Sequence, residues 1–333
     1  MSQSRFDVLT IGNAIVDVMA RTEEDFLVAE GLSKGTMHLI DAERAETLHL
    51  AMETAIERSG GSAGNTAAGV ASLGGRAAFI GKVADDPLGT LYRRDMHETG
   101  VHFATAPLGE GAPTARSMIL ITPDGERTMN TYLGACQMLG PADIDEAVVA
   151  GAAVTYLEGY LWDPPEAKKA FRHAADVAHK AGRKVSLTLS DAFCVDRYRA
   201  EFLELVRSRT IDILFANDSE LKSLYETSDL GTAVAAVRAD SALSAVTIGA
   251  DGALVVTPDG VETVPAMPVM DIADLTGAGD LFAAGFLYCV VRGMSLAEAA
   301  RLGNLAAGEV IGHIGPRPGV SLAELASGAG FRL

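Results

Sequence analysis

The sequence predicts an α/β fold in which a mostly parallel sheet carries helices on both faces. The chain has 333 residues, of which 48% are hydrophobic, so it can bury one large core. No internal repeat, low-complexity tract or linker divides it, and residues 1–333 are expected to form a single domain. The regular alternation from Ala152 onward is typical of parallel sheets. Apolar strands are predicted at 152–158, 184–189, 211–215 and 244–248, with helices at 164–181, 198–207, 217–226 and 230–239.

The first part of the chain mixes hairpins with strand-helix units. Pro123-Asp124-Gly125 and Pro258-Asp259-Gly260 are typical hairpin turns. They would join strands 117–122 with 128–133 and, later, 253–256 with 261–265. The other predicted strands are 6–11, 14–21, 35–41 and 76–83, and the other helices are 42–58, 88–98, 278–292 and 295–311.

Composition excludes several classes of partner. The net charge is −17, with 44 acidic against 27 basic residues, so nucleic acid and anionic membranes would be repelled. The apolar runs are too short to span a bilayer, and no apolar signal core follows Met1. Cys136, Cys194 and Cys289 lie far apart without metal-ligand spacing, which favours reduced thiols and a cytoplasmic location.

The segment from Asp274 to Asp280 has the composition of an anion-binding helix start. It reads Asp-Leu-Thr-Gly-Ala-Gly-Asp and precedes an apolar helix. Glycines let the backbone approach a ligand closely, and the free N–H groups of a helix start attract an anion. Asp280 could be an ordinary cap, or it could accept a proton from a hydroxyl that attacks a bound phosphoryl group.

Two earlier segments place polar groups at predicted turns. Gly60-Gly61-Ser62-Ala63-Gly64-Asn65 opens a helix of small residues. It indicates either close helix packing or a ligand contact through the Asn65 amide, which offers a donor and an acceptor. Asp17 interrupts an apolar strand that follows Gly12-Asn13. It could face water at a sheet edge or accept hydrogen bonds from two sugar hydroxyls.

Later segments leave similar alternatives open. Asn217-Asp218-Ser219-Glu220 fits a capping box, or a Mg²⁺ contact by Glu220 through water. Thr247 to Gly252 fits a loop over a nucleotide or a simple turn. Asn304 could be a helix-surface amide or a base contact, and Arg127 could reach a ligand phosphate or only solvent.

Other catalytic arrangements are absent from the sequence. The seven histidines form no pair at metal spacing, and no Ser-His-Asp or Cys-His order is supported by neighbouring motifs. The pattern Gly-x4-Gly-Lys-Ser/Thr does not occur, and no dinucleotide fingerprint follows the first strand. A P-loop enzyme and a dehydrogenase are therefore disfavoured.

The glycine-rich segments resemble the signatures of the ribokinase-like sugar kinases, the PfkB family, and within it the adenosine kinase-like members. The resemblance runs from about Phe6 to Gly319 and rests on Gly60 to Asn65, Asn217-x-x-Glu220 and Asp274 to Asp280, in matching order and spacing. It implies a ribokinase-like three-layer α/β/α sandwich with a central mostly parallel sheet. It also implies a small β-sheet lid, formed by insertions at about 14–41 and 100–135.

The resemblance further implies roles for individual residues. Asp280 would be the catalytic base, and the backbone amides of Gly277, Ala278 and Gly279 would form an anion hole. Asn13, Asp17, Gly61 and Asn65 would hold the sugar hydroxyls, while Asn217, Thr247, Gly249, Gly252 and Asn304 would line the nucleotide site. Glu220 would serve Mg²⁺ through water, and Asp274 and Thr276 match a position at which family members often bind a monovalent cation such as K⁺.

We therefore expect an ATP-dependent kinase that phosphorylates a primary hydroxyl of a nucleoside or sugar. Adenosine, phosphorylated at its 5′-hydroxyl to give AMP and ADP, is the expected acceptor because Gly12 to Asp17 and Gly134-Ala135-Cys136 resemble adenosine kinase-like members. The alternatives are a kinase for ribose, fructose or another sugar, and a catalytically silent nucleoside or sugar sensor. Small molecules are the expected partners, and the protein would be a monomer or homodimer.

Overall fold

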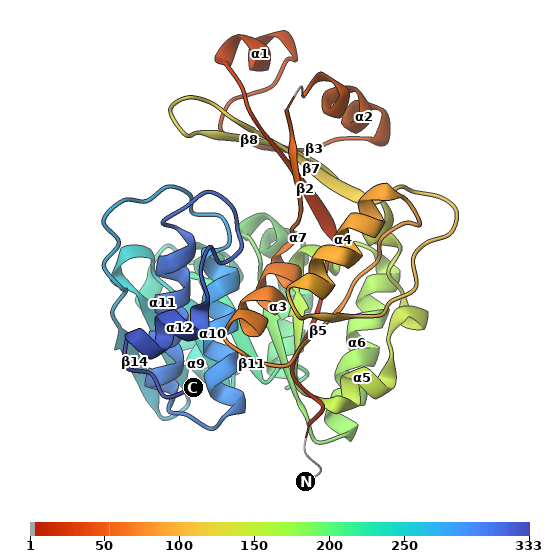
Figure 1. Cartoon of the computed structure of the whole chain (residues 1–333). Helices are drawn as coiled ribbons and strands as arrows, with labels where there is room; N and C mark the ends of the chain where they lie inside the picture. Colours follow the sequence, from red (N-terminus) through yellow and green to blue (C-terminus); the bar gives the residue numbers. More distant parts are fainter. Residues whose placement is uncertain (1–3, 53) are drawn as a thin grey trace.

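Two β-sheets of different size organise the described part of the chain, residues 4–52 and 54–333 of a computed structural model (Figure 1). The large sheet has nine strands, in the order β14 (Gly260–Val264), β13 (Ala253–Thr257), β12 (Leu243–Thr247), β11 (Ile213–Asn217), β10 (Lys184–Thr188), β9 (Ala152–Glu158), β1 (Phe6–Ile11), β5 (Ala77–Ile80), β6 (His102–Phe103). The strands from β12 to β6 in this order run parallel, and β13 and β14 return as an antiparallel hairpin. The prediction of a mostly parallel sheet is confirmed.

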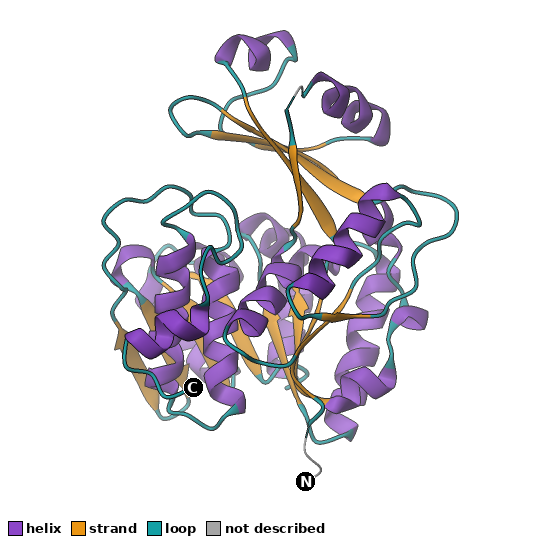
Figure 2. Cartoon of the chain, viewed as in Figure 1, coloured by secondary structure: helices purple, strands orange, loops and turns teal. Residues whose placement is uncertain are grey.

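Helices cover both faces of the large sheet and enclose two hydrophobic cores (Figure 2). One face carries α3 (Ser62–Ser72), α10 (Ala278–Val291), α11 (Leu296–Val310) and α12 (Leu322–Gly328). The other carries α5 (Glu146–Gly151), α6 (Pro165–Lys180), α7 (Ala192–Arg207), α8 (Asp218–Leu224) and α9 (Leu230–Asp240). Neighbours along β1 alternate between the cores: Val8 lies in the first and Leu9 in the second, because successive strand residues point to opposite faces. This arrangement is the three-layer sandwich that the sequence predicts.

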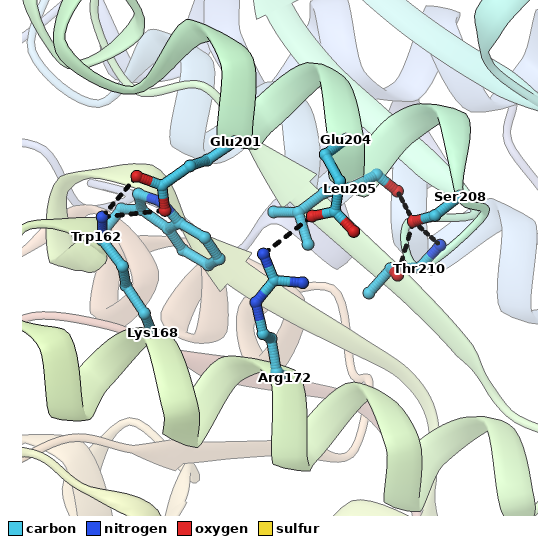
Figure 3. Close-up of polar contacts among 8 residues, drawn as sticks. All are labelled: Trp162, Lys168, Arg172, Glu201, Glu204, Leu205, Ser208 and Thr210. Carbon is cyan, nitrogen blue, oxygen red and sulfur yellow. Dashed lines mark hydrogen bonds and ion pairs between the residues drawn. The ribbon is translucent and has the colours of Figure 1, made fainter.

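Polar contacts join α6 to α7 at the outer surface (Figure 3). Glu201 of α7 accepts hydrogen bonds from Lys168 at 2.8 Å and from the indole of Trp162 at 3.0 Å. Arg172 pairs with Glu204 one turn further along, at 2.8 Å. α7 begins at Ala192, where the Asp191 side chain caps it by accepting a hydrogen bond from the Cys194 amide. Its backbone is non-helical at Tyr198, so the helix predicted over 198–207 corresponds to the part of α7 that follows this kink.

The small sheet stands away from the sandwich at the upper end of Figure 1. It has five strands, in the order β3 (Met37–Leu39), β8 (Arg127–Tyr132), β7 (Ala115–Ile121), β2 (Ile15–Arg21), β4 (Ile56–Ser59). The short helices α1 (Glu24–Ala29) and α2 (Ala42–Ala51) lie beside it, and α4 (Pro87–Glu98) contacts β4. The helix predicted over 42–58 ends at Ala51, and the prediction is wrong for 56–59, which pair with β2 instead. Residue 53 lies outside the described residues. The small sheet therefore also draws on a segment outside the two predicted insertions.

The three cysteines are free and buried. Among the helices of the described residues, none combines the length and apolarity needed to cross a bilayer.

Candidate active site

The carboxyl ends of the parallel strands bring several predicted residues to one edge of the large sheet. Asn13 follows β1, Asn217 ends β11, and Thr247 ends β12 directly opposite Asn217. Glu158 ends β9 at the same edge. Ligands of open α/β sheets bind outside this edge, where strands lead into helices.

The start of α10 is shaped by Gly277. Its φ of +85° is left-handed, and a Cβ there would lie 2.7 Å from the carbonyl oxygen of Pro316, so only glycine suits the position. In the described part of the chain, the amides of Gly277 and Gly279 donate to no acceptor, whereas the Ala278 amide donates to the Leu275 carbonyl at 3.3 Å. Two of the three amides predicted for an anion hole are thus available at the positive end of the helix dipole.

The small residues of α3 allow it to pack closely on α10. A Cβ at Gly69 would lie 2.7 Å from the Ala284 Cβ, so a larger residue would push the helices apart. At the start of α3, Gly61 has φ +82° and its Cα approaches the Asn13 carbonyl, where a Cβ would come within 2.2 Å. Close packing, one of the two alternatives for this segment, is therefore present, and a ligand contact through the Asn65 amide stays a prediction.

Asp280 lies in the first turn of α10 and is held by two donors from α3. The Ser62 hydroxyl donates to Oδ1 at 2.6 Å, and the Asn65 side-chain nitrogen donates to Oδ2 at 3.0 Å. Burial raises the pKa of Asp280 above its ordinary value, while these two hydrogen bonds and the nearby Arg317 guanidinium oppose the rise. The carboxylate is oriented and lies one turn from the unpaired amides of Gly277 and Gly279, an arrangement that suits a base for an attacking hydroxyl.

Asp17 is a buried carboxylate without a hydrogen-bond partner. Only 8% of the residue is exposed, and its side chain accepts no hydrogen bond from the described residues. Burial raises its pKa to about 7, although Arg317 and Arg127 lower it. The edge-strand alternative, in which Asp17 faces water, does not apply. A carboxylate with so little exposure is poorly solvated, and two ligand hydroxyls would supply the donors that it lacks.

Glu158 supports the turn after β1. Its carboxylate accepts from the Asn13 side chain at 2.8 Å and from the Ala63 amide at 2.8 Å. Burial raises its pKa to about 7, and those bonds oppose the rise. Asn13 therefore uses a side-chain donor on the protein itself, and its side-chain oxygen accepts no hydrogen bond from the described residues.

Asn217 and Glu220 form a capping box at the start of α8. The Asn217 side chain accepts from the Glu220 amide at 2.8 Å, and the Asn217 amide donates to Glu220 at 2.9 Å. Burial raises the pKa of Glu220 to about 7. No cluster of three or more His, Cys, Asp or Glu side chains suited to a metal occurs among the described residues. Mg²⁺ would therefore be held mainly by nucleotide phosphates, with water between the ion and Glu220.

Asp274 and Thr276, the predicted cation ligands, are joined to Arg127 of β8. Asp274 accepts from the Thr276 hydroxyl at 2.7 Å and the Gly315 amide at 3.0 Å, and it pairs with Arg127 at 2.6 Å. A cation at this carboxylate would have to displace the guanidinium, so the residues as placed do not suit one. A dependence on K⁺ stays a prediction, which activity in K⁺-free buffer would test. Arg127 thus pairs with a carboxylate of the protein itself, that of Asp274.

The loop after β12 is fixed by backbone geometry. Gly249 and Gly252 have φ of +61° and +100°, and a Cβ at Gly252 would lie 2.1 Å from the Val264 carbonyl oxygen. Asn304 of α11 donates to the carbonyls of Val264 and Pro265, at 3.2 and 2.9 Å. Its amide nitrogen therefore fixes the chain at the end of β14, against which Gly252 packs, and a contact of Asn304 with a base stays a prediction. Gly249 lies at the same edge of the large sheet as Thr247, and its contact with a nucleotide stays a prediction.

Sequence reasoning missed three residues of the site: Ser62, Glu158 and Arg317. Glu158 could have been found, since an acid ends an apolar strand at the ligand edge. Ser62 lies inside the segment Gly60 to Asn65, but nothing in the sequence connects its hydroxyl with Asp280. Arg317 follows Pro316 in a loop without periodicity, and no local signal connects it to Asn65, to which its Nε donates at 3.2 Å.

Comparison with known proteins agrees with this geometry. The chain matches the model of the pfkB family carbohydrate kinases over residues 8–322. It is 58% identical to the adenosine kinase of Sinorhizobium meliloti, with a TM-score of 0.91 and coverage of 98% of this chain and 100% of that structure. It is 55% identical to a probable sugar kinase of Rhizobium etli, with a TM-score of 0.92 over 98% and 99% of the two chains. An ATP-dependent ribose-1-phosphate kinase of Halopiger xanaduensis is 34% identical over 267 residues, which cover 78% of this chain and 83% of that protein. The chain is a kinase with the ribokinase-like fold, and it belongs to the PfkB family.

Proposed function

We propose that this kinase transfers the γ-phosphoryl group of ATP to the 5′-hydroxyl of adenosine, giving AMP and ADP. The observation that carries the proposal is the convergence of Asp280 with Ser62 and Asn65 beside the free amides of Gly277 and Gly279. The proposal of adenosine is supported by the 58% identity to an adenosine kinase along the whole chain.

In this scheme the protein supplies position and charge more than covalent chemistry. Asp17, Asn13, Gly61 and Asn65 hold the ribose hydroxyls, and Asp280 orients the 5′-hydroxyl and accepts its proton. The oxygen then bonds to the γ-phosphorus while the bond to the β-phosphate oxygen breaks, and ADP leaves. Bound Mg²⁺ would neutralise charge on the phosphates. The amides of Gly277 and Gly279 donate to the group in transfer, and the loop from Thr247 to Gly252 lies beside the nucleotide.

The small sheet is proposed to act as a lid over the acceptor. Asp17 of β2 and Arg127 of β8 both reach from it toward the start of α10. Closing over the acceptor would exclude water and limit wasteful hydrolysis of ATP. The three free, buried thiols support the further proposal that the enzyme works in the cytoplasm.

A panel of acceptors tests the proposal. Formation of ADP would be followed with ATP, Mg²⁺ and either adenosine, ribose, fructose or ribose 1-phosphate, and the product identified by phosphorus NMR. We expect the highest kcat/KM with adenosine and AMP as the product. A higher kcat/KM with any of the three sugars would replace adenosine as the acceptor. Binding of adenosine without any ADP formation would instead favour the silent sensor.

A further inference from the structure

The loop after α11 returns to the candidate active site and contacts it at three points. The Gly315 amide donates to Asp274, and Pro316 packs against Gly277. Arg317 extends further, donating from Nε to Oδ1 of Asn65 at 3.2 Å and lying 3.4 Å from the sulfur of Met96. The flanking prolines restrict the backbone on either side of this arginine.

Arg317 determines which way the Asn65 amide points. An asparagine amide has an oxygen that only accepts and a nitrogen that only donates. Because the oxygen faces the Arg317 donor, the nitrogen faces Oδ2 of Asp280, to which it donates at 3.0 Å. The opposite orientation would place the amide nitrogen against a guanidinium and the amide oxygen against a carboxylate, and both contacts would be repulsive.

We propose that Arg317 is a positioning residue for phosphoryl transfer, which acts through Asn65 to hold the Asp280 carboxylate in place. Within the described residues, Arg317 forms no ion pair with a carboxylate, so its effect on Asp280 passes through the amide and through longer-range attraction. The inference rests on the role of Asp280 in the proposed function, and it adds a residue that the signature motifs do not contain.

Charged and titratable groups surround Asp280 on several elements. Arg317 faces it from the loop after α11, and Asp17 faces it from β2. The other titratable groups that interact with Asp280 are Glu158 and Tyr156 of β9 and Tyr160, which follows that strand. Since Asp17 and Glu158 also have pKa values near 7, a change in pH profile alone would not single out Asp280. The test therefore also uses a double-mutant cycle.

Four variants, Arg317→Met, Arg317→Lys, Asn65→Ala and the double variant Arg317→Met with Asn65→Ala, would be compared with the best acceptor of the panel. We expect Arg317→Met to lower kcat by about 10- to 100-fold, because small misplacements of a reacting group have effects of this size. We expect the KM for ATP to stay within about twofold, because Arg317 contacts no predicted nucleotide residue. Lysine keeps a charged donor for Oδ1 of Asn65. The kcat of Arg317→Lys should therefore be at least threefold higher than that of Arg317→Met.

In the Asn65→Ala background, Arg317→Met should lower kcat by less than about threefold, since residues that act as a unit are not additive. The acid limb of the kcat profile should move to higher pH in Arg317→Met, because loss of the cation raises the pKa of Asp280. The matched control is Arg301→Met, at an exposed arginine of α11 that stacks on Phe331. It should leave kcat and the pH profile unchanged. Fluorescence of Trp162, which is fully buried, would verify that each variant is folded.

An unchanged kcat in Arg317→Met, or equal kcat values in Arg317→Met and Arg317→Lys, would overturn the inference. So would a loss of kcat on adding Arg317→Met to Asn65→Ala that is as large as the loss in the wild-type background. The last would mean that Arg317 contacts the substrate independently. Failure of the proposed function is distinguishable, because it would appear as normal turnover in Asp280→Asn. If Asp280→Asn loses turnover but the effects of Arg317→Met and Asn65→Ala on kcat simply multiply, only the role of Arg317 is refuted.

Discussion

The Ser62 hydroxyl donates a hydrogen bond of 2.6 Å to Oδ1 of Asp280 and thereby links the start of α3 to the start of α10. This bond lowers the pKa of Asp280 against the effect of burial. It also occupies one of the two carboxylate oxygens that an acceptor hydroxyl would approach. Ser62 therefore both favours the ionised form of the carboxylate and competes with the acceptor for it.

Replacing Ser62 with alanine should move the acid limb of the kcat profile to higher pH. The folded protein loses a donor that favours the ionised carboxylate, so the pKa of Asp280 rises and less base is available at low pH. Steady-state kcat would be measured between pH 5 and 9. Ser208→Ala, at the far end of α7, is the control and should leave the profile unchanged. An acid limb that stays in place in Ser62→Ala would contradict the prediction.

Replacing Asp280 with asparagine should abolish most turnover while nucleotide binding survives. The amide keeps the size of the side chain but cannot accept the hydroxyl proton, and loss of a general base lowers rates by about 10²- to 10⁴-fold. Rates would come from ADP formation and affinity for ATP from calorimetry. The exposed Asp259→Asn, in the turn between β13 and β14, provides the matched control. Near-normal turnover in Asp280→Asn would remove the base assignment.

The extent to which the fold could be predicted depends on how local each signal is. From β9 onward, apolar strands and amphipathic helices alternate, and the structure follows the predicted order closely. The segment 56–59 was predicted as helix because it continues the pattern of α2. It forms β4 only through pairing with β2, and Val16 and Ser59 are paired although far apart in the sequence. Pairing of that kind leaves no local trace.

The residues of the candidate site also differ in how local their sequence signals are. Gly277 and Gly61 could be recognised because each needs a positive φ at a helix start, and Asp280 and Asn65 lie in the first turns of the two helices that follow. Arg317 could not be recognised, since its contact with Asn65 depends on how a distant loop folds back. The same holds for Asn304, whose side-chain nitrogen donates to the carbonyls of Val264 and Pro265, partners that only the folded chain brings near.

Replacing Asp17 with asparagine should stabilise the folded protein at pH 8 while weakening acceptor binding. Its pKa is raised by burial from 3.8 to about 7. As pH rises from 4 to 7 the unfolded chain ionises while the folded chain retains its proton, so the wild type loses free energy of unfolding over that window. At pH 8, Asp17→Asn should therefore raise the free energy of unfolding by at most about 4 kcal/mol. Below pH 4, where Asp17 is protonated in both the folded and the unfolded chain, this gain should be absent.

Urea unfolding at pH 4 and pH 8, followed by Trp162 fluorescence, measures this difference. The exposed Asp229→Asn is the comparison, since asparagine also caps α9 and no buried charge is lost. Equal stability of Asp17→Asn and the wild type at pH 8 would show that Asp17 is already satisfied in the free protein. In that case its proposed role as an acceptor for two ligand hydroxyls would lose its support.

Replacing Gly277 and Gly279 separately with alanine should shift stability in opposite directions. At Gly277, φ is +85° and the new Cβ would lie 2.7 Å from the Pro316 carbonyl oxygen, so the variant should lose about 1–3 kcal/mol. At Gly279 a Cβ meets nothing within 4 Å, and alanine favours the first turn of α10, so the variant should gain up to about 1 kcal/mol. Urea unfolding measures both. Gly277→Ala should also lower kcat, because Pro316 must move and Arg317 with it. Equal stabilities for the two variants would mean that the turn before α10 adapts freely, and then its amides could not form a preorganised anion site.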